Sequence, residues 1–195
     1  MLRSIAEVVR QKLKEGYRCV YLNSLPMVAG MKSYLAAVGV DVAYEINRGS
    51  LVLSSDQNHL TKGIFSVDQM IRNLEFGIEQ ALRDGYKGLW ASGDMTWEFG
   101  PQQDFGMLIE YEWRLEELFR KGPHLSGICQ YHKDTLPHEV LRLGLQSHQN
   151  LFVNETLSLV NPHYVPAKFS GAVVSINPSA IDETISQLST HPGPH

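Results

Sequence analysis

The sequence predicts an α/β fold in which a mostly parallel β-sheet is flanked by helices. Short β-rich segments alternate with longer segments of helical periodicity from residue 2 to about residue 150, and this alternation is typical of βαβ units. The chain has 195 residues, of which 43% are apolar and 19% are charged. These values fit one globular domain with a modest extension.

The helices are predicted from apolar residues that recur on one face. The first runs from Leu2 to Glu15 and ends at Gly16. Another follows Ser66-Val67-Asp68-Gln69, a capping box in which Ser66 and Gln69 satisfy each other's exposed backbone donors, and stops at Gly85. Further helices are predicted at residues 25–38, 104–120, 136–146 and 181–188.

The strands are predicted from short segments rich in β-branched and aromatic residues. Segments 42–47 and 50–54 could form a hairpin around Arg48-Gly49 or lie on separate parts of the sheet. A second pair, 151–153 with 156–160, is predicted to form a terminal hairpin. The remaining strands are predicted at residues 18–23, 88–91 and 125–131.

Composition excludes several classes of partner. A net charge of −4 and a pI near 6.0 argue against nucleic acid, because binding to phosphates relies on clustered Lys and Arg. No stretch reaches the roughly 18 apolar residues of a membrane span, and the N-terminus lacks the apolar core of a signal peptide. We therefore expect a cytoplasmic protein, with Cys19 and Cys129 as buried thiols.

The motifs of common cofactor sites are absent. The chain contains neither GxxxxGK[ST] nor GxGxxG, so no phosphate-binding loop is predicted. His138-Glu139 resembles the start of HExxH, but Arg142 replaces the second His. Cys129, Tyr131 and His132 alternate along a strand and cannot all face one ion. We expect no cofactor and no metal.

The stretch Gly88 to Trp97, GLWASGDMTW, is the best candidate for a binding site. If residues 88–91 form a buried strand, the turn after them lies at the carboxyl edge of the sheet, where ligand crevices form. Trp90, Asp94, Met95 and Trp97 would then surround the mouth of a pocket. Trp90 and Trp113 fit a core as well as a pocket, whereas the glycine turn before Trp97 favours a pocket.

Seven strings in order resemble one family: GYRCVYLNS, LAAVGVDVAYEINRGSLVL, GIFSVDQMI, GYKGLWASGDMTW, YEWRLEELF, GICQYHKD and NPHYVP. The chain resembles the MEDS domain, named for methanogens, methylotrophs and the sensory part of the regulator DcmR. The resemblance covers residues 5 to 168. It implies a three-layer KaiC/RecA-like fold without an ATP-binding loop. It also implies a sensor of hydrocarbon derivatives that acts alone or with histidine kinases and DNA-binding regions.

The chain departs from that family at two places. MEDS domains usually open with a strand resembling His-x-Cys-x-x-Tyr, whereas this chain begins at the first helix, and Trp90 stands where relatives often carry Arg. A strand missing inside the sheet would leave unpaired backbone groups. We expect the apolar segment Ala172–Ile176 to fill this position in its own chain or in a second copy's, the latter giving a homodimer. Residues 1–168 would then form the sensory domain and residues 169–195 a partly disordered extension.

These observations support a non-enzymatic sensory domain that binds a small, largely apolar organic ligand. Asp94 would be the polar anchor and Trp97 a wall of the pocket. The signal would pass to a partner such as a histidine kinase or a transcription regulator. One alternative is a degenerate ATPase fold that serves only as a protein interaction module, and another is an enzyme with Asp94 or Glu98 as its base. The predicted ligand-binding residues are Trp90, Asp94, Met95, Trp97, Glu112 and Tyr131.

Overall fold

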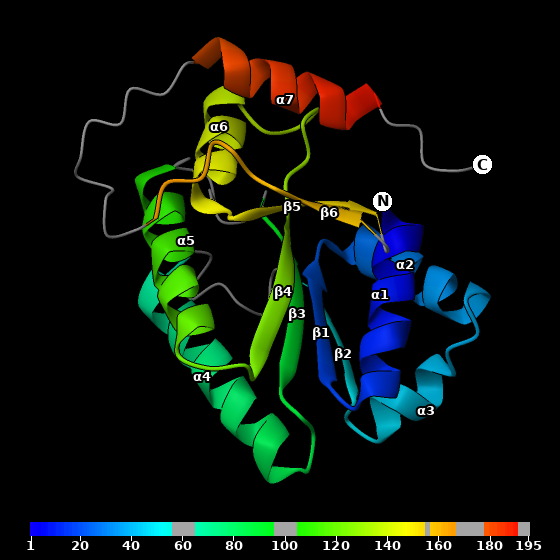
Figure 1. Cartoon of the computed structure of the whole chain (residues 1–195). Coiled ribbons are helices and arrows are strands. Elements are labelled where there is room, and N and C mark those ends of the chain that lie inside the picture. The colour runs from blue at the N-terminus through cyan, green and yellow to red at the C-terminus, as the bar shows by residue number, and fades with distance from the viewer. Residues whose placement is uncertain (56–64, 96–104, 155–156, 167–177, 191–195) are drawn as a thin grey trace.

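The computed structural model is a three-layer α/β arrangement in which one sheet lies between two groups of helices (Figure 1). It describes residues 1–55, 65–95, 105–154, 157–166 and 178–190. The predicted α/β class, with a parallel sheet flanked by helices, is therefore confirmed. Trp97 and the segment Ala172–Ile176 lie outside the described residues.

The sheet has four parallel strands in the order β2-β1-β3-β4. Each pair is in continuous register, as in Cys19↔Trp90 and Trp90↔Ser126. Because all strands are parallel, their carboxyl ends lie at one edge of the sheet. The strands are β1 (Arg18–Asn23), β2 (Leu51–Ser55), β3 (Leu89–Asp94) and β4 (Leu125–Gln130).

One face of the sheet is covered by α1 (Leu2–Glu15) and α2 (Leu25–Ala37) (Figure 1). The apolar stripe predicted for α1 packs into the core, since Ile5, Ala6 and Val9 have no exposed surface. The helix ends at Gly16, which adopts the left-handed conformation with φ 88°. These helices, the sheet residues Cys19, Tyr21 and Leu51, and Trp90 form one continuous core.

The opposite face is covered by α4 (Val67–Arg83) and α5 (Phe105–Arg120) (Figure 1). The predicted cap of α4 is partly confirmed, because Ser66 Oγ accepts a hydrogen bond of 3.3 Å from the Gln69 amide. Met70 and Ile71 of α4 and Leu108 of α5 are buried in a second core. The two helical layers therefore bury both faces of the sheet, as a parallel sheet requires.

The C-terminal part adds α6 (His138–Ser147), the antiparallel hairpin of β5 (Asn150–Asn154) and β6 (Leu157–Val160), and α7 (Pro178–Thr190). The predicted terminal hairpin and the helix near residue 181 are thus confirmed. Helix α7 lies across α6 (Figure 1). Arg142 joins them by donating two hydrogen bonds, of 2.9 and 2.6 Å, to the Asp182 carboxylate.

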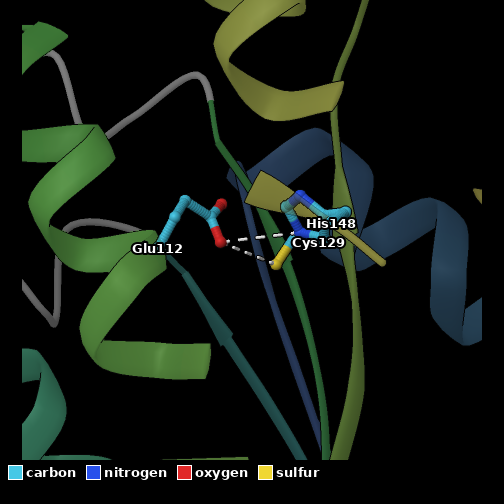
Figure 2. A group of neighbouring side chains, drawn as sticks. All are labelled: Glu112, Cys129 and His148. Atoms are coloured by element: carbon cyan, nitrogen blue, oxygen red, sulfur yellow. Dashed lines mark hydrogen bonds and ion pairs between the residues drawn. The ribbon is translucent and has the colours of Figure 1, made fainter. Parts of the chain in front are cut away.

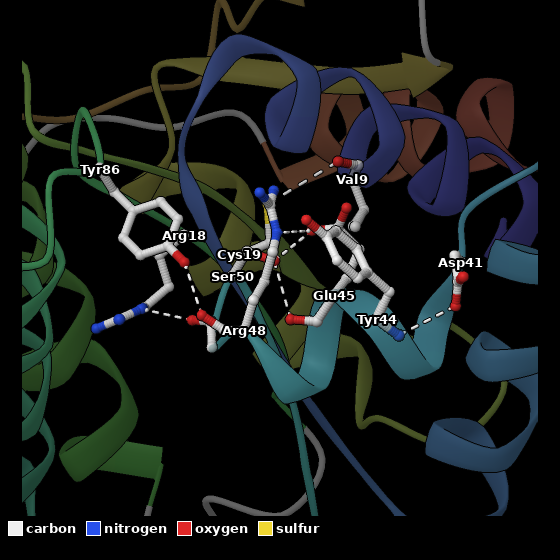
Figure 3. Close-up of polar contacts among 10 residues, drawn as sticks. Val9, Arg18, Cys19, Asp41, Tyr44, Glu45, Arg48, Ser50 and Tyr86 are labelled. Atoms are coloured by element: carbon white, nitrogen blue, oxygen red, sulfur yellow. Dashed lines mark hydrogen bonds and ion pairs between the residues drawn. The ribbon is translucent and has the colours of Figure 1, made fainter.

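The predicted strand at residues 42–47 is wrong, because this segment forms the short helix α3 (Val42–Asn47). Asp41 caps it by accepting a 3.0 Å hydrogen bond from the Tyr44 amide (Figure 3). Side-chain capping and contacts with α2 and β2 outweigh the β propensity of Val42, Tyr44 and Ile46. The segment after Gly49 forms β2, which pairs with β1 in parallel, so the hairpin alternative is also excluded.

In the order β2-β1-β3-β4, each described strand of the sheet is hydrogen-bonded to the next, so no position between these strands is empty. Strand β4 pairs with β3 on one side, and within the described residues no strand pairs with its other edge. The gap expected inside the sheet is therefore not found between the described strands. Among the helices that the structure describes, none combines the length and apolar character needed to cross a bilayer.

Candidate functional site

A cavity of about 520 Å³ lies along the outer edge of β4. It is bounded by the start of α1, the end of β4 with the following loop, α6, β5 and α7. The N-terminal end of α1 lies close to the β5–β6 hairpin in the same region (Figure 1). Residues from both ends of the chain thus meet at one sheet edge. The apolar lining includes Ile5, Ile128, Leu141, Leu145, Phe152, Ile185 and Leu188.

Strand β4 contributes side chains to both sides of this cavity. Ile128 packs with the core under α1, whereas Cys129 and Tyr131 pack with the core under α4 and α5. This alternation follows from the two-residue period of a strand. The cavity therefore lies beside the end of β4, and side chains from both layers line it.

Gln130, the last residue of β4, supplies a buried polar group to the cavity lining. Its Nε2 donates a 2.8 Å hydrogen bond to Ser92 Oγ, and that hydroxyl donates a 3.0 Å bond to the Ile128 carbonyl. Within the described residues Gln130 Oε1 has no hydrogen-bond partner. A buried acceptor without a partner costs about 1–3 kcal/mol, and the nearby Tyr21 side chain also interacts with the Gln130 amide.

Four polar side chains gather between this cavity and a second one of about 420 Å³. Glu112 comes from α5, Cys129 and Tyr131 from β4 and the loop after it, and His148 from the end of α6 (Figure 2 shows Glu112, Cys129 and His148). Glu112 Oε2 lies 3.8 Å from Cys129 Sγ and 3.5 Å from His148 Nε2. Tyr131 donates a short hydrogen bond to the other carboxylate oxygen, Glu112 Oε1.

The structure separates the predicted site residues. Trp90 is only 2% exposed and packs in the core beneath α1 and α2, lining neither described cavity. Met95 is buried in the other core, and its amide donates a 3.0 Å hydrogen bond to the Gln130 carbonyl. Asp94 is buried near His132, with 3.6 Å between Oδ2 and Nε2. Trp97 lies outside the described residues, and of the other five the structure brings Glu112 and Tyr131 into direct contact.

Further polar residues at the carboxyl edge were not predicted from the sequence. Asn23, at the end of β1, is fully buried and donates a 3.0 Å hydrogen bond to Tyr21 Oη. Burial raises the pKa of Tyr21 to about 12, so this phenol stays protonated even at pH 10. An Asn at the end of an otherwise apolar strand is a signal that could have identified this edge.

Comparison with known families identifies the chain. A model of the family described as "MEthanogen/methylotroph, DcmR Sensory domain" matches residues 1–149. The chain belongs to the MEDS family. No curated protein and no solved structure matches it.

The MEDS match divides the main cavity between two parts of the chain. Residues 1–149 contribute α1, β4 and α6, whereas β5 and α7 lie beyond the matched region. The cavity is thus formed by the MEDS domain together with the C-terminal elements of this particular chain. His148 is the next-to-last matched residue, so the Glu112–Cys129–His148 cluster lies within the MEDS domain.

Proposed function

We propose that this MEDS domain is a non-enzymatic sensory module that binds a small, largely apolar organic molecule in the cavity at the edge of β4. The observation that carries the proposal is this cavity of about 520 Å³, which has mainly apolar walls and a buried amide oxygen. Its volume is within the range of about 300–1,000 Å³ that is common for small-molecule sites. Membership of a sensory family supports the same role.

The lining indicates the chemistry of the ligand. Side chains such as Leu141, Leu145 and Phe152 provide apolar contact, which favours a hydrocarbon body. Gln130 lines the cavity, and a small movement of its amide would expose Oε1, which could then accept a hydrogen bond from a hydroxyl or an N–H group on that body. We therefore expect a hydrocarbon derivative with one donor group in place of a charged or phosphorylated compound.

The signal would leave through α7. Ile185 and Leu188 of α7 line the cavity, so an occupant would contact this helix and change its preferred position relative to α6. A partner such as a histidine kinase or a transcription regulator would read that change in the cytoplasm. The parallel sheet flanked by helices supports a KaiC/RecA-like origin for the scaffold.

The test is a thermal-shift screen of the full chain against small alcohols, ketones, amines and halogenated hydrocarbons. We expect at least one class to raise the Tm in a saturable way. Leu188→Trp fills the cavity and should abolish that shift, whereas Leu157→Trp on β6, outside the cavity lining, should keep it. Failure of every compound to bind, or an equal shift in L188W, would contradict the proposal.

The donor group of the ligand can be tested separately. Gln130→Met removes the amide while keeping a similar length, so it should weaken binding of a donor-bearing ligand about tenfold. Binding of the matched ligand without the donor should change little. Equal weakening of both ligands would show that Gln130 does not accept a hydrogen bond from the ligand.

The alternative is a protein interaction module without a small ligand. It is favoured by β6, whose four described residues are all exposed, with Val160 at 79% and both Leu157 and Leu159 at 46%. An exposed apolar edge strand is a common docking element. If no compound binds and Val160→Asp removes self-association in sedimentation experiments, this alternative replaces the first proposal.

A further inference from the structure

Three side chains of metal-binding type converge from three different elements. They are Glu112 from α5, Cys129 from β4 and His148 from the end of α6 (Figure 2). One ligand atom of each lies within 4.8 Å of the other two. These residues are 17 and 19 positions apart in the sequence and share no motif, so the fold alone brings them together.

The spacing of these atoms is close to that of a tetrahedral site. Bonds of about 2.0–2.1 Å to oxygen and nitrogen and about 2.3 Å to sulfur place neighbouring ligands around Zn²⁺ roughly 3.3–3.6 Å apart. The observed separations are 3.5 Å from Glu112 Oε2 to His148 Nε2 and 3.8 Å from Glu112 Oε2 to Cys129 Sγ. The Cys129 and His148 ligand atoms lie within 4.8 Å of each other, so side-chain rotations are needed to bring all three ligands to one ion.

The hydrogen bonds of His148 orient its ring for metal binding. Nδ1 lies 2.7 Å from the Gly144 carbonyl, which can only accept, so Nδ1 carries a hydrogen. In the neutral ring Nε2 then has a free lone pair, and this atom faces the Glu112 carboxylate. Two lone pairs facing each other repel unless a proton or a metal cation lies between them. A metal-bound His typically has this pattern, with its second nitrogen donating to a carbonyl.

Glu112 also favours a positive charge near Oε2, to which the Cys129 thiol donates a hydrogen bond of 3.8 Å. Its side chain is only 3% exposed, and in the described part of the chain it forms no ion pair with Lys or Arg. Tyr131 donates to Oε1, which leaves Oε2 facing Cys129 and His148. Gly144 allows this position of Tyr131, because a Cβ atom there would lie 2.6 Å from the Tyr131 ring. A buried carboxylate without a cation is costly.

We propose that Glu112, Cys129 and His148 form a binding site for a borderline divalent cation such as Zn²⁺. Mixed oxygen, sulfur and nitrogen ligands suit this class of ion better than Mg²⁺ or Ca²⁺. Tyr131 is a positioning residue that holds the Glu112 carboxylate. Cys129 and His148 also line the main cavity, so a fourth ligand, either water or a small molecule, reaches the ion from that side.

The test uses full-length, tag-free protein loaded with Zn²⁺ or Co²⁺ alone. We expect one equivalent by elemental analysis after desalting, and a thiolate-to-Co²⁺ charge-transfer band in the near ultraviolet. Second-sphere changes commonly weaken a site about 10–100-fold, so C129S, H148Q and E112Q should each weaken binding by more than about 100-fold. Y131F should weaken it about tenfold.

The controls are Cys19→Ala, at the other cysteine, and His124→Gln, at an exposed histidine. Both should bind Zn²⁺ within about twofold of the unchanged protein. Less than one equivalent in the unchanged protein, or a charge-transfer band that survives in C129S, would overturn the proposal. An imidazolium–carboxylate pair of His148 and Glu112 would then explain the cluster.

Circular dichroism would reveal a variant that does not fold. Even then, the Co²⁺ spectrum of the unchanged protein shows whether a thiolate binds the ion. No organic ligand is present in this experiment. The metal site and the organic ligand site can therefore fail independently.

Discussion

The packing around Trp90 and the packing around Tyr131 differ, although the two residues lie on neighbouring strands. Trp90 is on the inner strand β3, which has a strand on each side and helices on both faces, and it is 2% exposed in a filled core. Tyr131 follows the edge strand β4 and lines the main cavity. The open edge of a parallel sheet must be covered by other elements, and here these elements leave space.

The largest effect should come from removing the tryptophan in the filled region. Trp90→Ala should lower the free energy of unfolding by about 3–5 kcal/mol, because the core cannot collapse around the missing indole. Trp113→Ala, at a partly exposed position on α5, should cost roughly half as much. Urea unfolding followed by circular dichroism measures both. Equal losses would show that the region around Trp90 is not specially well packed.

A smaller loss of stability is expected at Gly144, which is in close contact with Tyr131 in the cavity wall. Gly144→Ala would place a Cβ atom 2.6 Å from the Tyr131 ring and should cost about 1–3 kcal/mol. The matched change is Gly30→Ala on α2, where the nearest contact is the end of the Leu2 side chain at 3.3 Å. That change should be neutral or stabilising because alanine favours a helix. A stable G144A protein would mean that Tyr131 can move without cost.

The two cysteines should distinguish the regions at alkaline pH. Burial raises the pKa of Cys19 from 9.0 to about 12. The unfolded thiol therefore ionises first, so stability is fully present below pH 9 and decreases as the pH rises toward 12.

Between pH 8 and pH 10, Cys19→Ala should lose about 1 kcal/mol less stability than the unchanged protein. The stability loss of Cys129→Ala, in the cavity region, is measured over the same pH interval for comparison. Urea titrations at both pH values measure the difference. If C19A and the unchanged protein lose the same stability between these pH values, the raised pKa of Cys19 is contradicted.

The smallest effect on stability should come from the ion pair that joins α7 to α6 beside the cavity. Arg142 and Asp182 have side chains that are both 35% exposed, so water and salt screen their attraction. Arg142→Ala should lower the Tm by no more than about 2 °C. The difference should vanish at high salt, whereas Arg83→Ala, at an exposed pair within α4, should have no measurable effect. A large loss would mean that α7 holds the cavity closed.

Local patterns predicted much of the fold. The stripe of Leu2, Ile5 and Val9 and the cap at Ser66 identified α1 and α4, because these signals depend only on residues within a few positions. Residues 42–47 were assigned to the wrong class, because a six-residue apolar segment suits a strand or a helix and Asp41 decided between them. The order of the strands could not be derived from propensity, since pairing depends on contacts between distant residues.

The sequence by itself determined the α/β class, the MEDS resemblance and most of the helices, because these depend on composition, short motifs and short-range periodicity. Only the tertiary structure placed Trp90 in a filled core and brought Glu112, Cys129 and His148 together. The reason is physical. A cavity and a metal-type cluster depend on which sheet edge is left open and on which distant side chains cover it, and these are properties of the packed chain.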